Sequence, residues 1–112
     1  MHLSRIAGVA LAIAAFYTGS AQAAGDPAKG KQVFDRWCTQ CHGRGPGHPG
    51  TQSLAVRYRG STPEALEDRT DLTPKVTALY VREGVQLMPF FRKTEISDAD
   101  LADLSAYLAK GK

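Results

Sequence analysis

The chain has 112 residues, of which 43% are hydrophobic, and its formal net charge is +3. This length allows one domain, and the hydrophobic content is that of a globular protein, not of a disordered chain. Removing residues 1–23 would take away one basic residue and leave 13 basic against 11 acidic residues. So small an excess argues against a dedicated nucleic-acid-binding protein.

Residues 1–23 have the pattern of a cleaved secretory signal peptide. Arg5 supplies a positive start, residues 6–17 are almost all apolar, and Ala21–Ala23 offers small residues for a signal peptidase. The apolar run is shorter than the roughly 20 residues that cross a bilayer as a helix. We therefore expect a bacterial periplasmic protein with a mature domain at residues 24–112 and no stable membrane insertion. An uncleaved N-terminal anchor is the alternative.

Three dipeptides carry the same helix-start signal, a short polar residue followed by proline. The polar side chain can cap free amides, and proline suits the first helical position because its missing N–H had no partner there. These signals are Asp26-Pro27, Thr62-Pro63 and Thr73-Pro74. They predict helices over residues 27–38, about 63–68 and 74–83, with a loop over residues 43–60 that is rich in glycine and proline at its start.

The last predicted helix is the clearest in the chain. Ser97 can cap it, and Asp100 stands where a capping box places an acid. Leu101, Leu104 and Tyr107 then recur at spacings of three, as on one helix face. Since no stretch alternates at period two, the sequence predicts an all-α fold of three to four short helices.

The central motif is Cys38-Thr39-Gln40-Cys41-His42. Residues three apart on a helical turn share a face, so two thiols at this spacing can add to the two vinyl groups of one haem. His42 follows at once and can ligate the iron from below. The pattern C-x-x-C-H is typical of c-type haem attachment, and it predicts one covalent haem c bound by Cys38 and Cys41.

Other interpretations of the two cysteines remain. A thiol–disulfide oxidoreductase pair normally sits near a βαβ pattern, which this sequence lacks. A structural zinc site needs four ligands, and His48 would have to join the set. The motif can also arise by chance in an idle surface turn. A haem additionally explains how so short a mature chain folds, because it supplies an apolar centre for packing.

Met88 is the single methionine of the mature chain, in the run Gln86-Leu87-Met88-Pro89-Phe90. A thioether is a soft iron ligand that raises the reduction potential, and Pro89 keeps Met88 out of a helix. We therefore expect His42 and Met88 as the two axial ligands. Met88 as a core filler, His48 as the sixth ligand, and an open sixth site are the alternatives.

Together these residues resemble the class I cytochromes c over the whole mature chain. In that family a glycine and an aromatic residue of the first helix cross a leucine–aromatic pair of the last helix. Gly30 and Phe34 match the first pair, and Leu104 and Tyr107 match the second. The family also uses a proline carbonyl to support the proximal imidazole, for which Pro46 and Pro49 are both candidates.

A narrower resemblance concerns the partner. The runs Tyr58-Arg59-Gly60, Leu72-Thr73-Pro74 and 88–96 are similar to the small cytochrome subunits of alkylphenol-oxidising flavocytochromes, the p-cresol methylhydroxylase and eugenol hydroxylase types. This resemblance implies a non-catalytic electron carrier that takes electrons from an FAD-containing flavoprotein subunit. It then passes them to another cytochrome or a cupredoxin. A free periplasmic cytochrome that shuttles between respiratory complexes is the alternative.

Basic residues follow both predicted haem-binding segments, where we expect them to border an exposed haem edge. Such charges steer an acidic partner and speed its encounter. Pairing with the haem propionates is the other role open to them. The residues are Arg44, Arg57, Arg59, Arg92 and Lys93.

Overall fold

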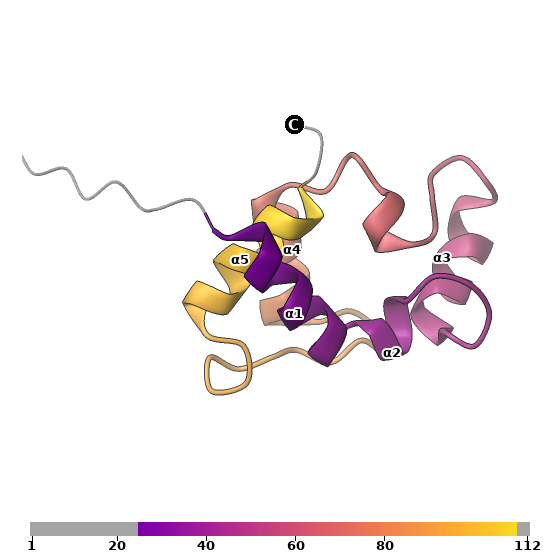
Figure 1. Cartoon of the computed structure of the whole chain (residues 1–112). Coiled ribbons are helices and arrows are strands. Elements are labelled where there is room, and N and C mark those ends of the chain that lie inside the picture. Colours follow the sequence, from indigo (N-terminus) through magenta and orange to yellow (C-terminus); the bar gives the residue numbers. More distant parts are fainter. Residues whose placement is uncertain (1–24, 110–112) are drawn as a thin grey trace, which may run out of the picture.

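The computed structural model describes residues 25–109. This part of the chain contains no strand, which confirms the predicted all-α fold. Its elements are α1 (Pro27–Trp37), α2 (Thr39–His42), α3 (Pro49–Tyr58), the 3₁₀ turn η1 (Leu66–Asp68), α4 (Pro74–Glu83) and α5 (Asp98–Leu108) (Figure 1). The predicted signal peptide lies outside the described residues and stays a prediction.

Helix starts were predictable where a capping side chain precedes proline. Asp26 accepts hydrogen bonds from the amides of Ala28 and Lys29, and Thr73 accepts one from the amide of Val76. Ser97 and Asp100 form the reciprocal capping box. The prediction of a helix starting at Pro63 was wrong, because the next helical element is the three-residue turn η1, and its N-cap residue makes no side-chain capping bond.

The prediction of a loop over residues 43–60 was also wrong, because these residues include the ten-residue helix α3. This helix begins at Pro49, but its cap residue His48 makes no side-chain capping bond. Contacts with α2 hold it instead: the buried hydroxyl of Thr51 donates to the carbonyl oxygen of Gly43 at 2.8 Å. The helix ends at Arg59, which has left-handed backbone angles (φ 48°).

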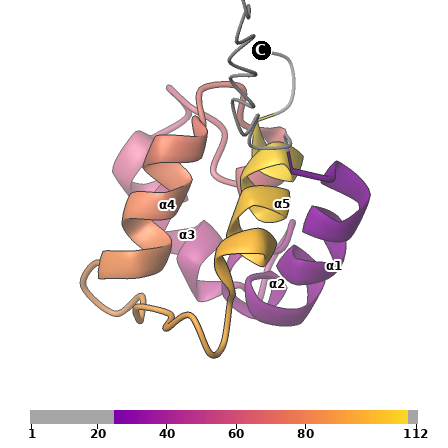
Figure 2. The same ribbon diagram turned by 90° about the vertical axis from the view of Figure 1, so that its left-hand side faces the viewer.

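Helices α1 and α5 cross closely, as both ribbon views show (Figures 1 and 2). A Cβ atom added at Gly30 would overlap the backbone carbonyl of Asp103, so only glycine permits this approach. The rings of Phe34 and Tyr107 pack beside the crossing with their centroids 5.8 Å apart. The expected crossing of Gly30 and Phe34 with Leu104 and Tyr107 is therefore confirmed.

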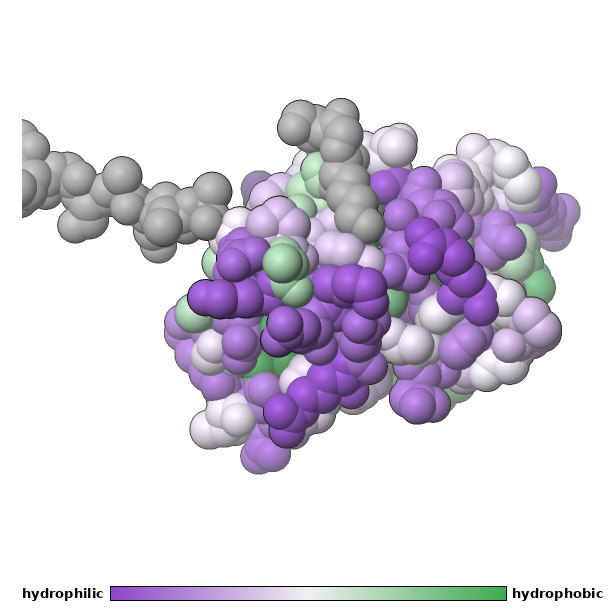
Figure 3. Space-filling model, viewed as in Figure 1, coloured by the Kyte–Doolittle hydropathy of each residue, from purple (hydrophilic) through white to green (hydrophobic). Residues whose placement is uncertain are grey.

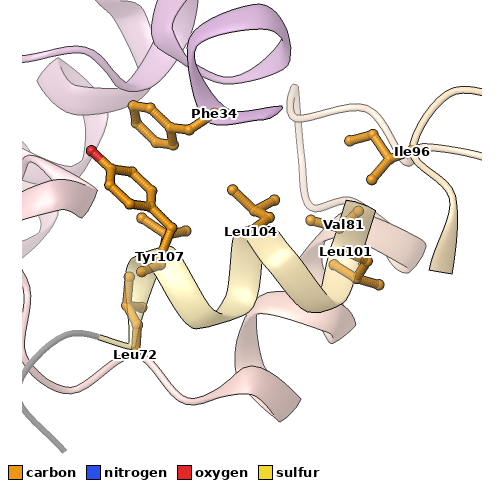
Figure 4. Close-up of a cluster of buried hydrophobic side chains, with 8 residues drawn as sticks. Phe34, Leu72, Val81, Ile96, Leu101, Leu104 and Tyr107 are labelled. Atoms are coloured by element: carbon orange, nitrogen blue, oxygen red, sulfur yellow. The ribbon is translucent and has the colours of Figure 1, made fainter. Parts of the chain in front are cut away.

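The hydrophobic core continues along α5. In Figure 4, Phe34 lies over Tyr107 near one end of this helix, while Ile96 and Val81 lie near Leu101 at the other end. Phe34, Ile96 and Leu104 are almost completely buried. Apolar side chains from α1, α4 and the segment before α5 thus pack around α5 in one cluster.

A network of polar side chains ties η1 to the rest of the domain. Arg44 forms ion pairs with Glu67 at 2.8 Å and with Asp68 at 2.7 Å, and the Tyr107 hydroxyl donates to Glu67. The face seen in Figure 3 is mostly hydrophilic. Among residues 25–109, no helix combines the length and the apolar character that crossing a membrane requires.

Candidate haem site

A cavity of about 500 Å³ is lined by residues of α3, α4 and α5 together with the attachment motif. Most of its lining side chains are apolar, including Leu54 of α3, Val76 of α4 and Leu108 of α5. Pockets for small molecules and cofactors span roughly 300–1,000 Å³ and are mainly apolar with a few polar groups. The cavity thus has the size and lining of a cofactor site.

Three of the four predicted site residues line this cavity. Cys38 and His42 come from the motif around α2, and Met88 comes from the segment after α4. Cys41 is exposed and is not among the lining residues. Segments 46 residues apart in the sequence, at His42 and Met88, therefore meet at one apolar cavity.

The His42 ring is held by close contact with α3. Its Nδ1 atom is buried and has no hydrogen-bond partner, and a Cβ atom at Gly50 would stand 2.9 Å from Nδ1 and 2.7 Å from Cε1. Nδ1 is thus turned toward the protein, which leaves Nε2 as the nitrogen available to a metal. Burial lowers the pKa of His42, which favours the neutral imidazole that binds metals.

The two candidate prolines lie in different elements. Pro49 is the first residue of α3 and directly precedes Gly50, whereas Pro46 belongs to the irregular turn before α3. Neither carbonyl accepts a hydrogen bond from Nδ1. His48 does not line the cavity; its Nδ1 lies 3.1 Å from the carbonyl oxygen of Gln40 and donates to it across the motif.

The chemistry of the cysteines fits a covalent attachment better than the alternatives. They form no disulfide, and burial, together with the neighbouring Cys41, raises the pKa of Cys38 to about 12. Thiol–disulfide oxidoreductases need the opposite, a cysteine with a lowered pKa. Within residues 25–109, no three His, Cys, Asp or Glu side chains gather where they could share a metal ion, so zinc has no ligand set there.

One part of the cavity is polar. Arg57, Tyr58 and Arg69 line it, and Arg69 donates to the Tyr58 hydroxyl at 3.1 Å while pairing with Asp71 at 2.6 Å. Arg57 has no ion-pair partner among the described residues. These groups suit the two carboxylates of a haem. Sequence reasoning missed Tyr58 and Arg69, because nothing local distinguishes them from other surface residues.

Three of the other four basic residues expected at the haem edge form ion pairs with acidic neighbours. Arg44 pairs with Glu67 and Asp68, Arg92 pairs with Glu95, and Lys93 pairs with Asp98. Apart from Arg57, only Arg59 of this predicted set has no ion-pair partner within the described residues. The basic surface is thus smaller than the sequence suggested.

A comparison with protein families now decides the identity of the domain. The family model described as cytochrome C oxidase, cbb3-type, subunit III matches residues 25–108. The chain belongs to this cytochrome c family. Membership makes it a class I cytochrome c, an electron-transfer domain with covalently bound haem c. No curated protein and no solved structure matches the chain significantly.

Proposed function

We propose that this cytochrome binds its one haem through Cys38 and Cys41 and holds the iron between His42 and Met88. The observation that carries this proposal is the meeting of Cys38, His42 and Met88 at one apolar cavity. Arg57, Tyr58 and Arg69 supply the polar groups for the haem carboxylates. Bound in this way, a haem iron exchanges single electrons reversibly.

When the haem is bound, His42 and Met88 would hold its iron, and the apolar side chains of the cavity would surround it. The apolar lining excludes water and thereby favours the reduced, less charged state of a redox centre. His42 is fixed by the contact of its ring with Gly50. With no position left for a substrate, the domain acts as an electron carrier and catalyses no reaction itself.

We propose that the electron donor is the FAD-containing subunit of an alkylphenol-oxidising flavocytochrome, and that the carrier works in the bacterial periplasm after loss of residues 1–23. The resemblance of residues 58–60 and 88–96 to such cytochrome subunits supports this partner. The exposed apolar side chains Leu87 and Phe90, next to Met88, suit a protein–protein contact. Electrons then pass to another cytochrome or a cupredoxin.

A second candidate is a free periplasmic cytochrome that carries electrons between respiratory complexes. The description of the matching family, a subunit of an oxidase, connects related domains with respiratory electron transfer. The two candidates differ in the stability of the complex. The flavocytochrome role predicts that a tagged chain purified from its native cells retains a flavoprotein in stoichiometric amount; a lone monomer would support the free carrier.

Mass spectrometry of the exported protein tests the haem assignment. We expect the mass of residues 24–112 plus one haem, no free thiol, and no haem in a Cys38→Ser/Cys41→Ser variant. His42→Ala should fail to yield stable red protein. Met88→Ala should keep its haem but have a lower potential and bind carbon monoxide. A wild-type spectrum and potential in Met88→Ala would reduce Met88 to a packing residue.

A further inference from the structure

The segment between α4 and α5, residues 84–97, carries Met88 and is called here the Met88 loop. A tight turn sets the backbone of Met88: its amide donates to the carbonyl oxygen of Val85 at 2.9 Å, and its carbonyl oxygen accepts from the Val85 amide at 3.1 Å. Gln86, within the turn, has a positive φ of 52°, and Leu87 at its tip is fully exposed. Val85, Gln86 and Met88 of this turn line the cavity while its tip is exposed, and a residue further along the loop anchors the segment to the domain.

Phe91 provides that anchor through three different groups. Its amide donates to the carbonyl oxygen of Val81 at 2.7 Å. Its ring meets Trp37 edge-on, with the centroids 5.8 Å apart. Its carbonyl oxygen accepts a hydrogen bond from Arg82 at 3.0 Å. Because Trp37 directly precedes Cys38, this residue connects the Met88 loop with the haem-attachment motif.

The guanidinium group of Arg82, in α4, forms hydrogen bonds with the second half of the Met88 loop. Besides Phe91, its Nη1 donates to the carbonyl oxygen of Ile96 at 2.9 Å, and its Nη2 donates to Asp98 at 3.0 Å. Only 20% of the Arg82 side chain is exposed, whereas Asp98 is largely exposed. The two bonds to backbone carbonyls are therefore better shielded from water than the ion pair.

We propose that Arg82 is a positioning residue that holds the Met88 loop against α4 and so keeps Met88 at the cavity. This inference rests on the proposed role of Met88 as the sixth iron ligand. A planar guanidinium can reach Phe91, Ile96 and Asp98 at once, but a lysine ammonium has no such fork of donors. Without Arg82, two part-buried carbonyls lose their partner, and the loop opens more often.

Carbon monoxide binding to the ferrous holoprotein measures that opening, because the gas must displace Met88. Arg82→Gln should accelerate binding roughly 100-fold or more, because it removes two charge-assisted hydrogen bonds. Arg82→Lys should give a smaller acceleration. Exchange of the Phe91 amide proton, followed by NMR, should accelerate in parallel, which reports on the loop without using the haem.

Two matched variants separate positioning from general stability. Asp98→Asn removes the exposed ion pair but leaves both carbonyl bonds of Arg82, and should raise the carbon monoxide binding rate only by a small factor, far less than Arg82→Gln. Arg44→Gln breaks a salt-bridge network of similar size at η1, away from the Met88 loop, and should leave the rate unchanged. If Arg44→Gln accelerates binding as much as Arg82→Gln, the effect is general and the proposal is refuted.

Met88→Ala distinguishes failure of this inference from failure of the ligand assignment. If Met88→Ala binds carbon monoxide no faster than wild type, Met88 is not the ligand and both proposals fall. If Met88→Ala opens the site but Arg82→Gln keeps the wild-type rate and Phe91 exchange, only the role of Arg82 is refuted. Should Arg82→Gln not fold, a wild-type rate in Arg82→Lys would refute it equally.

Discussion

The two sides of α5 differ in how completely the polypeptide packs by itself. Toward α1, the Gly30 crossing lets the backbones touch, and Phe34 and Tyr107 are only 1% and 6% exposed. Toward α3 and α4 lies the cavity, and the apolar side chains of Tyr80 and Val85 on its lining remain 44% and 47% exposed. The side toward α1, called here the finished side, is a closed core. The side toward α3 and α4, called here the cavity side, has an apolar surface that suits a group that the chain itself does not contain.

This difference indicates which contacts are available before the cofactor binds. The α1–α5 crossing is made only by residues of the chain, so it can form without the cofactor. Helix α3 has weaker support, since its contacts run through Thr51 to Gly43 and through Gly50 to His42. Those contacts belong to the attachment motif itself. The cavity side should therefore depend on the haem for its stability, as metal-dependent domains depend on their metal.

Omitting the haem should produce the largest effect. In a Cys38→Ser/Cys41→Ser chain we expect loss of most of the helical circular dichroism, because the cavity side loses its apolar centre. Hydrogen exchange should find the remaining protected amides in α1 and α5, with none in α3. If this variant keeps the helix content of the wild-type holoprotein and full protection of α3, the cavity side does not depend on the haem for its stability.

The next largest effect should come from the finished side. Tyr107→Ala in the holoprotein removes a buried ring from the crossing and should lower the free energy of unfolding by roughly 3–5 kcal/mol, measured by denaturant titration. Tyr107→Phe keeps the ring and loses only the hydrogen bond to Glu67, at a cost of about 1 kcal/mol. Similar losses in the two variants would mean that the hydroxyl, and not the ring, stabilises the crossing.

The sequence predicted α1, α4 and α5 far better than α3. Helices α1, α4 and α5 combine a capping residue with a regular apolar face, so both their type and their limits were readable. Helix α3 has no side-chain cap, and its apolar residues all fall in its second half, from Leu54 to Tyr58, so its first half resembles a loop in sequence. The motif residues were readable because their spacing is local, whereas Arg69 and Gly50 join the site only through tertiary contacts.

Gly50 offers a sharper test of the cavity side. In Gly50→Ala the new methyl group would meet the His42 ring and the Cys41 carbonyl oxygen at 2.7 Å, so the ring must move. We expect a loss of roughly 1–3 kcal/mol, as for an overpacked core, together with a changed haem spectrum and potential.

A nearby glycine provides the control for that experiment. Gly45 has a positive φ of 85°, and a Cβ atom added there would have no neighbouring atom within 4 Å, so Gly45→Ala strains the backbone without touching the ring. It should lose stability but keep the wild-type spectrum and potential. If Gly50→Ala also keeps both, close packing against α3 does not orient His42.

The smallest effect should be an acid-induced loosening of the Met88 loop. A backbone hydrogen bond from Arg92 lowers the pKa of Glu95, and a hydrogen bond from Lys93, with a second from Arg82, lowers the pKa of Asp98. A carboxylate with a lower pKa in the folded state than in the unfolded state stabilises the folded state. This contribution is fully present at a pH above the ordinary pKa and is lost as the pH falls through the folded-state pKa. Both groups are exposed, so the loss should be modest.

Carbon monoxide binding to the ferrous protein measures this loosening as the pH falls from about 5 to about 3, the range in which these carboxylates take up protons. We expect the wild-type rate to rise by a small factor over this interval. A Glu95→Gln/Asp98→Asn variant should already show the higher rate at about pH 5 and change less, because its two side chains cannot titrate. The protection factors of amides within α1 and α5, which are exchange rates relative to the intrinsic rate at each pH, should stay constant over the upper part of the range. A simultaneous loss of protection in these helices would mean that acid unfolds the whole domain. The finished side would then be no more stable to acid than the cavity side.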